Sequence, residues 1–162
     1  MRTRDLEKTE EAFQDLLTRF QTGYIDLGMI HFVDEMDEFR TIIDGEFYRY
    51  AKNLKDKGTI HHIGMSTHNP EVARAAAESG LIEMILFSVN PAFDMLPATE
   101  NIDDYFTDSS YENDGGINPE RAELYRICEQ NDVGITVMKG YAGGRLFKAG
   151  TSPFAVALTP VQ

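Results

Sequence analysis

Three polar side chains stand close to where predicted strands end, which is the arrangement that a catalytic site on parallel strands needs. His31 lies near the end of the apolar run Tyr24–Phe32, and Ser66 and Lys139 hold the same relative position on two later apolar runs. Strands of α/β enzymes present their reactive groups at their carboxyl ends, where an imidazole can serve in acid–base chemistry. The alternative for His31 is a core histidine with satisfied hydrogen bonds, because histidine is only intermediate in its preference for burial.

Helices and strands alternate along the chain, and these elements must position the three groups. Apolar residues recur at helical spacing over roughly 3–22. Asn69 can cap a helix that Pro70 begins and Gly80 ends. The remaining expected elements are a helix around 47–58, a helix opening at 118–120, and strands over 24–32, 59–66, 81–89 and 133–139.

Strands that alternate with helices indicate βαβ units and a parallel sheet. This pattern leaves two α/β architectures open, a doubly wound sheet or part of a (β/α)8 TIM-type barrel. A complete barrel needs ~250 residues, so about four parallel β/α units in 162 residues amount to half of one. We expect residues 1–162 to form a single truncated domain of this kind.

Charge and cysteine content narrow the classes of function. The chain has 15 Lys and Arg against 27 Asp and Glu, which gives a formal net charge of -12. An acidic surface disfavours nucleic acid and anionic membranes as partners. The single cysteine, Cys128, fits a reducing compartment. The charged N-terminus lacks the apolar core of a secretory signal, and no apolar run is long enough to span a bilayer, so we expect a soluble cytoplasmic protein.

No metal site is predicted. His61 and His62 are adjacent in a predicted strand, so their side chains must point to opposite faces and cannot bind one metal ion together. No other spacing of histidine and cysteine resembles a zinc or iron–sulfur motif.

Three segments, taken in order, carry a resemblance to a known family. They are YIDLGMIHF (24–32), GTIHHIGMSTHNPE (58–71) and GITVMKGYAGGRLF (134–147). With these segments the chain resembles the aldo-keto reductases, which fold as a (β/α)8 barrel and move a hydride from NADPH, less often NADH, to an aldehyde or ketone. The resemblance runs from the helix before the fourth barrel strand to just beyond the seventh, and it implies the barrel rather than the doubly wound sheet.

The resemblance implies roles for individual residues. His31 matches the histidine that orients the substrate carbonyl. Ser66 matches the serine that contacts the nicotinamide carboxamide, and Met138 falls where a side chain packs on the nicotinamide ring. The implied cofactor is NADP(H) in preference to NAD(H), and the implied partner is a small carbonyl compound. The loop beside the pyrophosphate is matched by Lys139, Gly140, Tyr141, Gly143 and Arg145.

That loop has a simpler reading as well. Glycines allow the backbone to approach a pyrophosphate closely, and cations supply charge to it. The same letters, GYAGG, also describe an ordinary glycine-rich turn. Their position directly after a predicted strand favours the cofactor loop.

The sequence also departs from the family pattern. The family's catalytic Asp and Tyr lie near the second barrel strand and its Lys on the third, and no residue here matches them. We therefore expect little or no reductase activity from this chain alone. The competing hypothesis is a non-catalytic half-barrel that self-associates, in which exposed strand edges of two copies pair in a homodimer.

Overall fold

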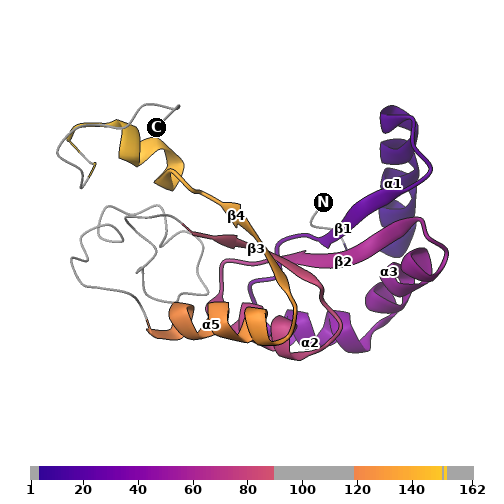
Figure 1. Ribbon diagram of the computed structural model, residues 1–162. Coiled ribbons are helices and arrows are strands. Elements are labelled where there is room, and N and C mark those ends of the chain that lie inside the picture. Colours follow the sequence, from indigo (N-terminus) through magenta and orange to yellow (C-terminus); the bar gives the residue numbers. More distant parts are fainter. Residues whose placement is uncertain (1–3, 90–118, 151, 153–162) are drawn as a thin grey trace.

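The computed structural model describes residues 4–89, 119–150 and 152, and the core of this part is a four-stranded parallel sheet. The strands are β1 (Ile25–Ile30), β2 (Ile60–Ser66), β3 (Met84–Ser88) and β4 (Gly134–Met138), and they lie side by side in chain order (Figure 1). All three pairings are parallel, as the alternation of elements predicts.

Helices connect these strands and lie against one side of the sheet. Figure 1 shows α2 and α5 on the same side of the strands. A doubly wound sheet has helices on both faces and a reversal in its strand order. The order β1-β2-β3-β4 has no reversal, so the doubly wound alternative is wrong and the arrangement is that of consecutive barrel units. The helices are α1 (Leu6–Phe20), α2 (Met36–Asp44), α3 (Glu46–Asp56), α4 (Pro70–Glu78) and α5 (Pro119–Gln130), followed by the short 3-10 turn η3 (Ala142–Phe147).

Local sequence explains where α4 begins. Asn69 has extended backbone angles, and its side-chain oxygen accepts a hydrogen bond from the Glu71 N–H. Pro70 occupies the first turn, where a missing N–H costs nothing. The predicted cap is therefore confirmed, although the helix ends at Glu78, just before Gly80.

Helix α2 was not expected from the sequence. The segment after β1 is rich in acidic residues and gave no predicted element, yet Met36–Asp44 is helical with Phe39 and Ile42 buried. These two residues are three apart and so share one helix face. Asp37 and Glu38 lie in the first turn, where negative charge favours the helix dipole.

The buried core lies between the sheet and the helices. On the strands it includes Ile63, Met65, Ile85 and Phe87, each at most 1% exposed. Across from them α4 contributes small residues, Val72, Ala73, Ala76 and Ala77, which let the helix approach closely.

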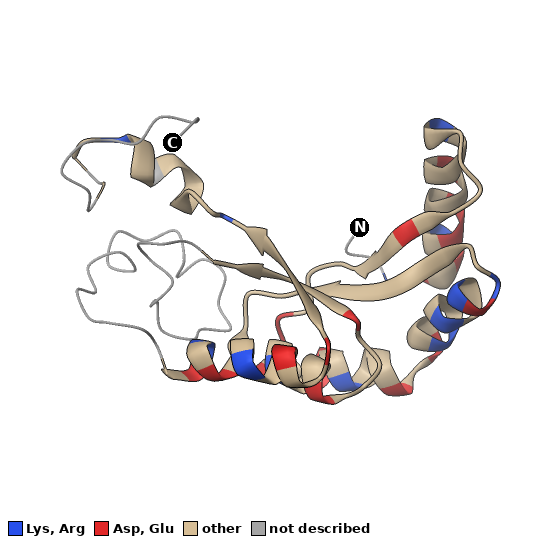
Figure 2. Cartoon of the chain, viewed as in Figure 1, with Lys and Arg blue, Asp and Glu red and all other residues tan. Residues whose placement is uncertain are grey.

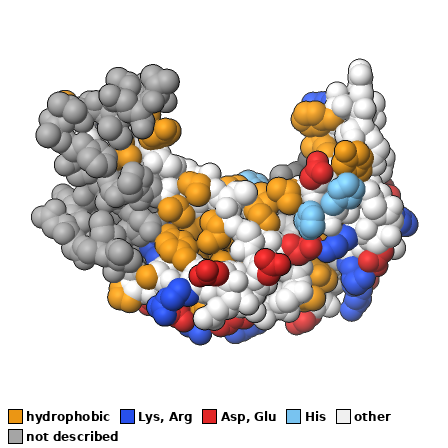
Figure 3. Space-filling view, in the orientation of Figure 1, with side chains coloured by type: hydrophobic (Ala, Val, Ile, Leu, Met, Phe, Trp, Pro, Cys, Tyr) orange, Lys and Arg blue, Asp and Glu red, His pale blue; other side chains and the backbone are white. Residues whose placement is uncertain are grey.

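The opposite face of the sheet is more open. The register pairs Leu27 with His62 and Met29 with Gly64, so Leu27 and Met29 share this face, and they are 42% and 37% exposed. Figure 3 shows hydrophobic side chains over the strands on the face seen there. Charged side chains gather mainly on the helices (Figure 2). Within the described ranges, no helix is both long and apolar enough to cross a bilayer.

The adjacent histidines have different partners, as their alternation predicts. The His61 ring stacks on Tyr24 at 4.7 Å between centroids and lies 3.5 Å from the Asp26 carboxylate. His62 Nδ1 instead lies 2.9 Å from the Glu83 carboxylate. In the described part of the chain, no group of three His, Cys, Asp or Glu side chains could hold a metal ion.

Candidate functional site

His31 and Ser66 come together at the carboxyl ends of β1 and β2. Ser66 is the last residue of β2, and its hydroxyl oxygen lies 2.9 Å from His31 Nδ1. The same oxygen accepts a hydrogen bond of 2.7 Å from the Phe32 N–H. Ser66 is only 3% exposed, whereas His31 is exposed at the end of the sheet. The parallel register, in which Ile30 stands opposite Met65, creates this contact between residues 35 positions apart.

The backbone next to His31 is held in an unusual conformation. Phe32 has φ 59°, in the left-handed region that an aromatic residue rarely adopts. Arg4 donates hydrogen bonds to the carbonyl oxygens of His31 and Phe32, and the Val33 N–H donates to the Ser66 carbonyl. These contacts on both sides fix the direction in which the His31 side chain leaves the strand.

Asp34 joins the loop after β1 to the loop after β2. Its carboxylate accepts hydrogen bonds from the Thr67 hydroxyl, the His68 N–H and His68 Nδ1, at 3.1, 2.8 and 3.0 Å. Its carbonyl oxygen accepts a further bond from the Asn69 side-chain amide. Burial alone would raise the pKa of Asp34, but the hydrogen bonds from His68 and Thr67 outweigh it and hold that pKa below 3.8.

Lys139 follows β4 and lies within electrostatic reach of Asp34. Burial lowers the pKa of the Lys139 ammonium group, and the Asp34 carboxylate partly opposes this shift. Met138 is the last residue of β4 and stands opposite Ser88 at the end of β3. Ser88 is 8% exposed, and its hydroxyl is a buried polar group without a hydrogen-bond partner in the described structure.

The glycine-rich segment after β4 forms a series of tight turns. Gly143 and Gly144 have φ values of 63° and 90°, and a Cβ added to either would meet nothing within 4 Å. The backbone of Arg145 continues η3. The Tyr141 ring packs against Phe147, with 4.7 Å between centroids. Gly140 precedes these turns, so the predicted loop residues follow one another directly beyond the end of β4.

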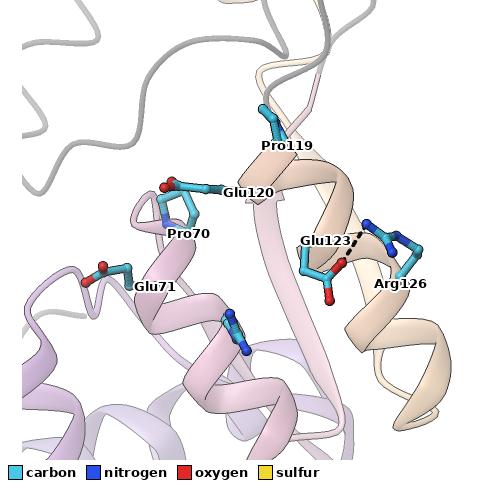
Figure 4. A pocket seen from close by; sticks show the side chains of 7 residues that line it. Pro70, Glu71, Pro119, Glu120, Glu123 and Arg126 are labelled. Atoms are coloured by element: carbon cyan, nitrogen blue, oxygen red, sulfur yellow. Dashed lines mark ion pairs between the residues drawn. The ribbon is translucent and has the colours of Figure 1, made fainter.

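A surface cleft of the described structure lies elsewhere. It has a volume of about 420 Å³ and lies between the first turns of α4 and α5, with Pro70 and Pro119 at its edge (Figure 4). Both arginines that line it are paired within their own helices, Arg126 with Glu123 and Arg74 with Glu78. The site residues predicted from the sequence do not line this cleft.

Several residues of the site were missed by the sequence analysis. Asp34 was not singled out, although its position three residues after His31, just beyond the end of a strand, was a usable signal. Arg4 carried no such signal, because its contacts with residues 31 and 32 exist only in the folded chain. Asn69 was expected only as a helix cap and also bonds Asp34.

Comparison with protein families decides the classification. The model of the aldo/keto reductase family matches residues 3–157. The chain belongs to the aldo/keto reductase family. The resemblance seen in three short segments is thereby confirmed over nearly the whole sequence. Comparison with curated protein sequences finds no significant match.

Solved aldo/keto reductases share the fold of this family member. An aldo-keto reductase from Bacillus halodurans in its holo form superposes with a TM-score of 0.60 at 24% identity, covering 86% of this chain and 37% of that one. A putative aldo-keto reductase from Pseudomonas aeruginosa gives 0.54 at 19% identity, covering 81% and 40%. An aldo/keto reductase from Klebsiella pneumoniae, solved with NADP and acetate, gives 0.53 at 17% identity, covering 90% and 40%. The chain thus spans about 40% of the length of these proteins.

Proposed function

We propose that this chain carries the carbonyl-orienting and part of the cofactor-binding half of an NAD(P)H-dependent reductase site that acts on an aldehyde or ketone. The observation that supports this proposal is the contact of 2.9 Å between Ser66 and His31 at the carboxyl ends of adjacent parallel strands. Active sites of barrel enzymes lie at this end of the sheet. The lone cysteine, Cys128, favours a reducing compartment, so we place this function in the cytoplasm.

His31 is the residue we assign to the substrate. An imidazole N–H that donates to a carbonyl oxygen stabilises the negative charge that develops there during reduction. His31 is exposed while its backbone is anchored by Arg4, so a small molecule can reach a ring that has a fixed direction. We assign no residue to the recognition of the rest of the substrate.

The residues around β3 and β4 fit a nicotinamide cofactor. The buried Ser88 hydroxyl has no protein partner in the described structure and stands next to Met138, so a polar group of a ligand can complete its hydrogen bonding. When bound, a reduced nicotinamide supplies the hydride. Ser66 and Met138 would contact the nicotinamide end. The loop of Lys139, Gly140, Tyr141, Gly143 and Arg145 would run beside the pyrophosphate, and we expect NADPH to be preferred to NADH.

We further propose that these 162 residues turn over substrate slowly or not at all by themselves. The tyrosine that donates a proton in the family, and the lysine and aspartate that support it, match no residue of the chain. Proton delivery to the developing alkoxide would then depend on water. Steady oxidation of NADPH with a reactive dicarbonyl, abolished by His31→Ala, would contradict this proposal.

The cofactor site can be tested by fluorescence titration of the purified chain with NADPH. Saturable binding that weakens at least tenfold in the double variant Lys139→Ala, Arg145→Ala would support the loop assignment. Lys148→Ala, which removes an exposed cation just beyond η3, is the matched control and should bind like the wild type. No binding at millimolar NADPH would overturn the cofactor assignment.

A second candidate function is self-association of a non-catalytic half-barrel. Leu27 and Met29 on β1, and Val137 on β4, are 42%, 37% and 56% exposed, and β1 and β4 are the outer strands of the described sheet. Unpaired strand edges beside apolar side chains favour pairing with a second copy. A monomeric mass by light scattering at micromolar concentration would exclude this function.

A further inference from the structure

We propose that Ser66 is a positioning residue that determines which nitrogen of the His31 ring carries the proton. The Ser66 hydroxyl would donate its proton to His31 Nδ1, so that neutral His31 keeps its own proton on Nε2. The use of that Nε2 proton on a carbonyl oxygen rests on the proposed function, whereas the protonation state of the free protein does not.

Counting the hydrogen bonds of the hydroxyl leads to this assignment. Ser66 Oγ has two polar neighbours in the described structure, the Phe32 N–H at 2.7 Å and His31 Nδ1 at 2.9 Å. The backbone N–H can only donate, so the oxygen is the acceptor in the first bond. The hydroxyl's single proton is then left for the second.

The opposite assignment would leave a buried donor unsatisfied. If His31 Nδ1 carried the proton, it would donate to Ser66 Oγ, and the hydroxyl proton would have no acceptor among the described residues. Ser66 is 3% exposed, so water could not easily replace that acceptor. A buried donor without an acceptor is destabilising, which favours the hydroxyl as the donor.

His68 provides a contrast within the same site. Its Nδ1 lies 3.0 Å from Asp34 Oδ2, and a carboxylate can only accept, so His68 carries a proton on Nδ1. The two histidines are therefore expected in opposite states at Nδ1. His68 can serve as an internal reference for a protonated Nδ1 in the same sample.

This role of Ser66 is compatible with a cofactor contact. A hydroxyl oxygen has two lone pairs, and the Phe32 N–H uses one of them. The second lone pair can accept a hydrogen bond from an amide N–H of a ligand. Ser66 would then act toward a bound carboxamide as an acceptor, while its proton stays on the bond to His31.

The test is nitrogen NMR of the histidine rings in the whole chain, without cofactor, at about pH 8, where an unperturbed imidazole is neutral. Long-range proton–nitrogen correlations distinguish protonated from unprotonated ring nitrogens. His31→Gln and His68→Gln assign the signals. We expect an unprotonated Nδ1 in His31 and a protonated Nδ1 in His68. A protonated Nδ1 in His31 of the wild-type protein overturns the proposal, whatever the variants do.

Three variants then distinguish the effect of the Ser66 hydroxyl from a general effect on folding. In Ser66→Ala the His31 Nδ1 signal should move toward that of a mixed population, whereas Ser66→Thr, which keeps the hydroxyl, should restore it. Ser79→Ala removes a hydroxyl that bonds the Ala76 carbonyl and the Leu81 N–H at the far end of α4, and it should leave the signal unchanged. An unaltered His31 signal in a folded Ser66→Ala protein would also overturn the proposal. Loss of NADPH binding in the separate titration would refute the cofactor assignment and leave this result standing.

Discussion

The Asp34 carboxylate and the His68 imidazole lie 3.0 Å apart, Oδ2 to Nδ1, and join the loops that follow β1 and β2. Both side chains are almost fully buried, at 4% and 8% exposed. The Asp34 carboxylate also accepts the His68 backbone N–H, so a single side chain fixes both the ring and the backbone of its partner. The loop after β2, which follows Ser66, is therefore bonded directly to the loop after β1, which contains His31.

Asp34→Ala should destabilise the protein by about 3 kcal/mol, because it removes the carboxylate that accepts from the Thr67 hydroxyl, the His68 N–H and His68 Nδ1 in a buried site. The urea midpoint measures the loss. Asp37→Ala is the control, since that carboxylate is exposed and pairs with Arg40 on the surface, and its loss should change stability by less than about 0.5 kcal/mol. Equal midpoints for the two variants would show that the link between the loops contributes nothing to stability.

The Asp34 link should also give the protein an acid dependence. The folded-state pKa of Asp34 is below 3.8, so its stabilisation is fully present above pH 3.8 and is lost as the pH falls through the folded value. The difference in unfolding free energy between wild type and Asp34→Asn should stay constant from neutral pH to about pH 5 and shrink at lower pH. A difference that is constant down to the acid unfolding transition would contradict this expectation.

Glu83 should also make the protein less stable in acid, through its contacts with Lys55, Ile63 and His62. Burial would raise its pKa, but hydrogen bonds from Lys55, the Ile63 N–H and His62 lower the pKa from 4.5 to about 2. The stabilisation is present above pH 4.5 and is lost as the pH falls toward about 2. Because the Glu83 side chain is 34% exposed, we expect Glu83→Gln to cost only about 1 kcal/mol at neutral pH.

The dependence on salt concentration tests whether the stabilisation by Glu83 is electrostatic. Partly exposed ion pairs are screened, so 1 M salt should reduce the cost of Glu83→Gln by about half. Glu78→Gln, which breaks the exposed pair with Arg74 on α4, is the control and should be nearly neutral at any ionic strength. Calorimetric unfolding at two salt concentrations measures both variants. A cost for Glu83→Gln that does not change with salt would point to the hydrogen bonds rather than charge.

A side chain at Gly64 should destabilise the folded protein. A Cβ at this position would lie 2.8 Å from Met84 Cε and 3.1 Å from the Met84 carbonyl oxygen on the neighbouring strand. The methyl group can move but the backbone cannot, so Gly64→Ala should cost about 1–3 kcal/mol. At Gly134 the nearest atoms would be 3.8 Å away, and Gly134→Ala should be neutral or slightly stabilising. Thermal unfolding of both variants decides the matter, and equal melting temperatures would exclude this packing.

Asn69 should contribute more than an ordinary helix cap. Its oxygen caps α4 and its amide donates to the Asp34 carbonyl at 3.0 Å. Asn69→Ala should therefore cost about 2–3 kcal/mol, whereas Asp5→Ala, which removes the exposed cap of α1, should cost clearly less. The two denaturation midpoints give the comparison. Equal losses would mean that the bond to Asp34 adds no stability.

Local patterns in the sequence were sufficient to predict most of the helices and strands. The apolar runs predict all four strands, the spacing of Asn69 and Pro70 predicts α4, and the alternation of elements predicts parallel pairing. These features depend on residues close to one another in the chain. Helix α2 was not predicted, although Met36, Phe39 and Ile43 recur at helical spacing, because its nine residues cover only about two turns.

The sequence by itself determined that His31 and Ser66 stand at strand ends, because a strand end is a local property. Only the tertiary structure decided what they contact. The bonds from Ser66 to His31 and from Asp34 to His68 join residues 35 and 34 positions apart. Such contacts exist only once the register of β1 against β2 is fixed, and that register depends on the packing of the whole sheet against its helices.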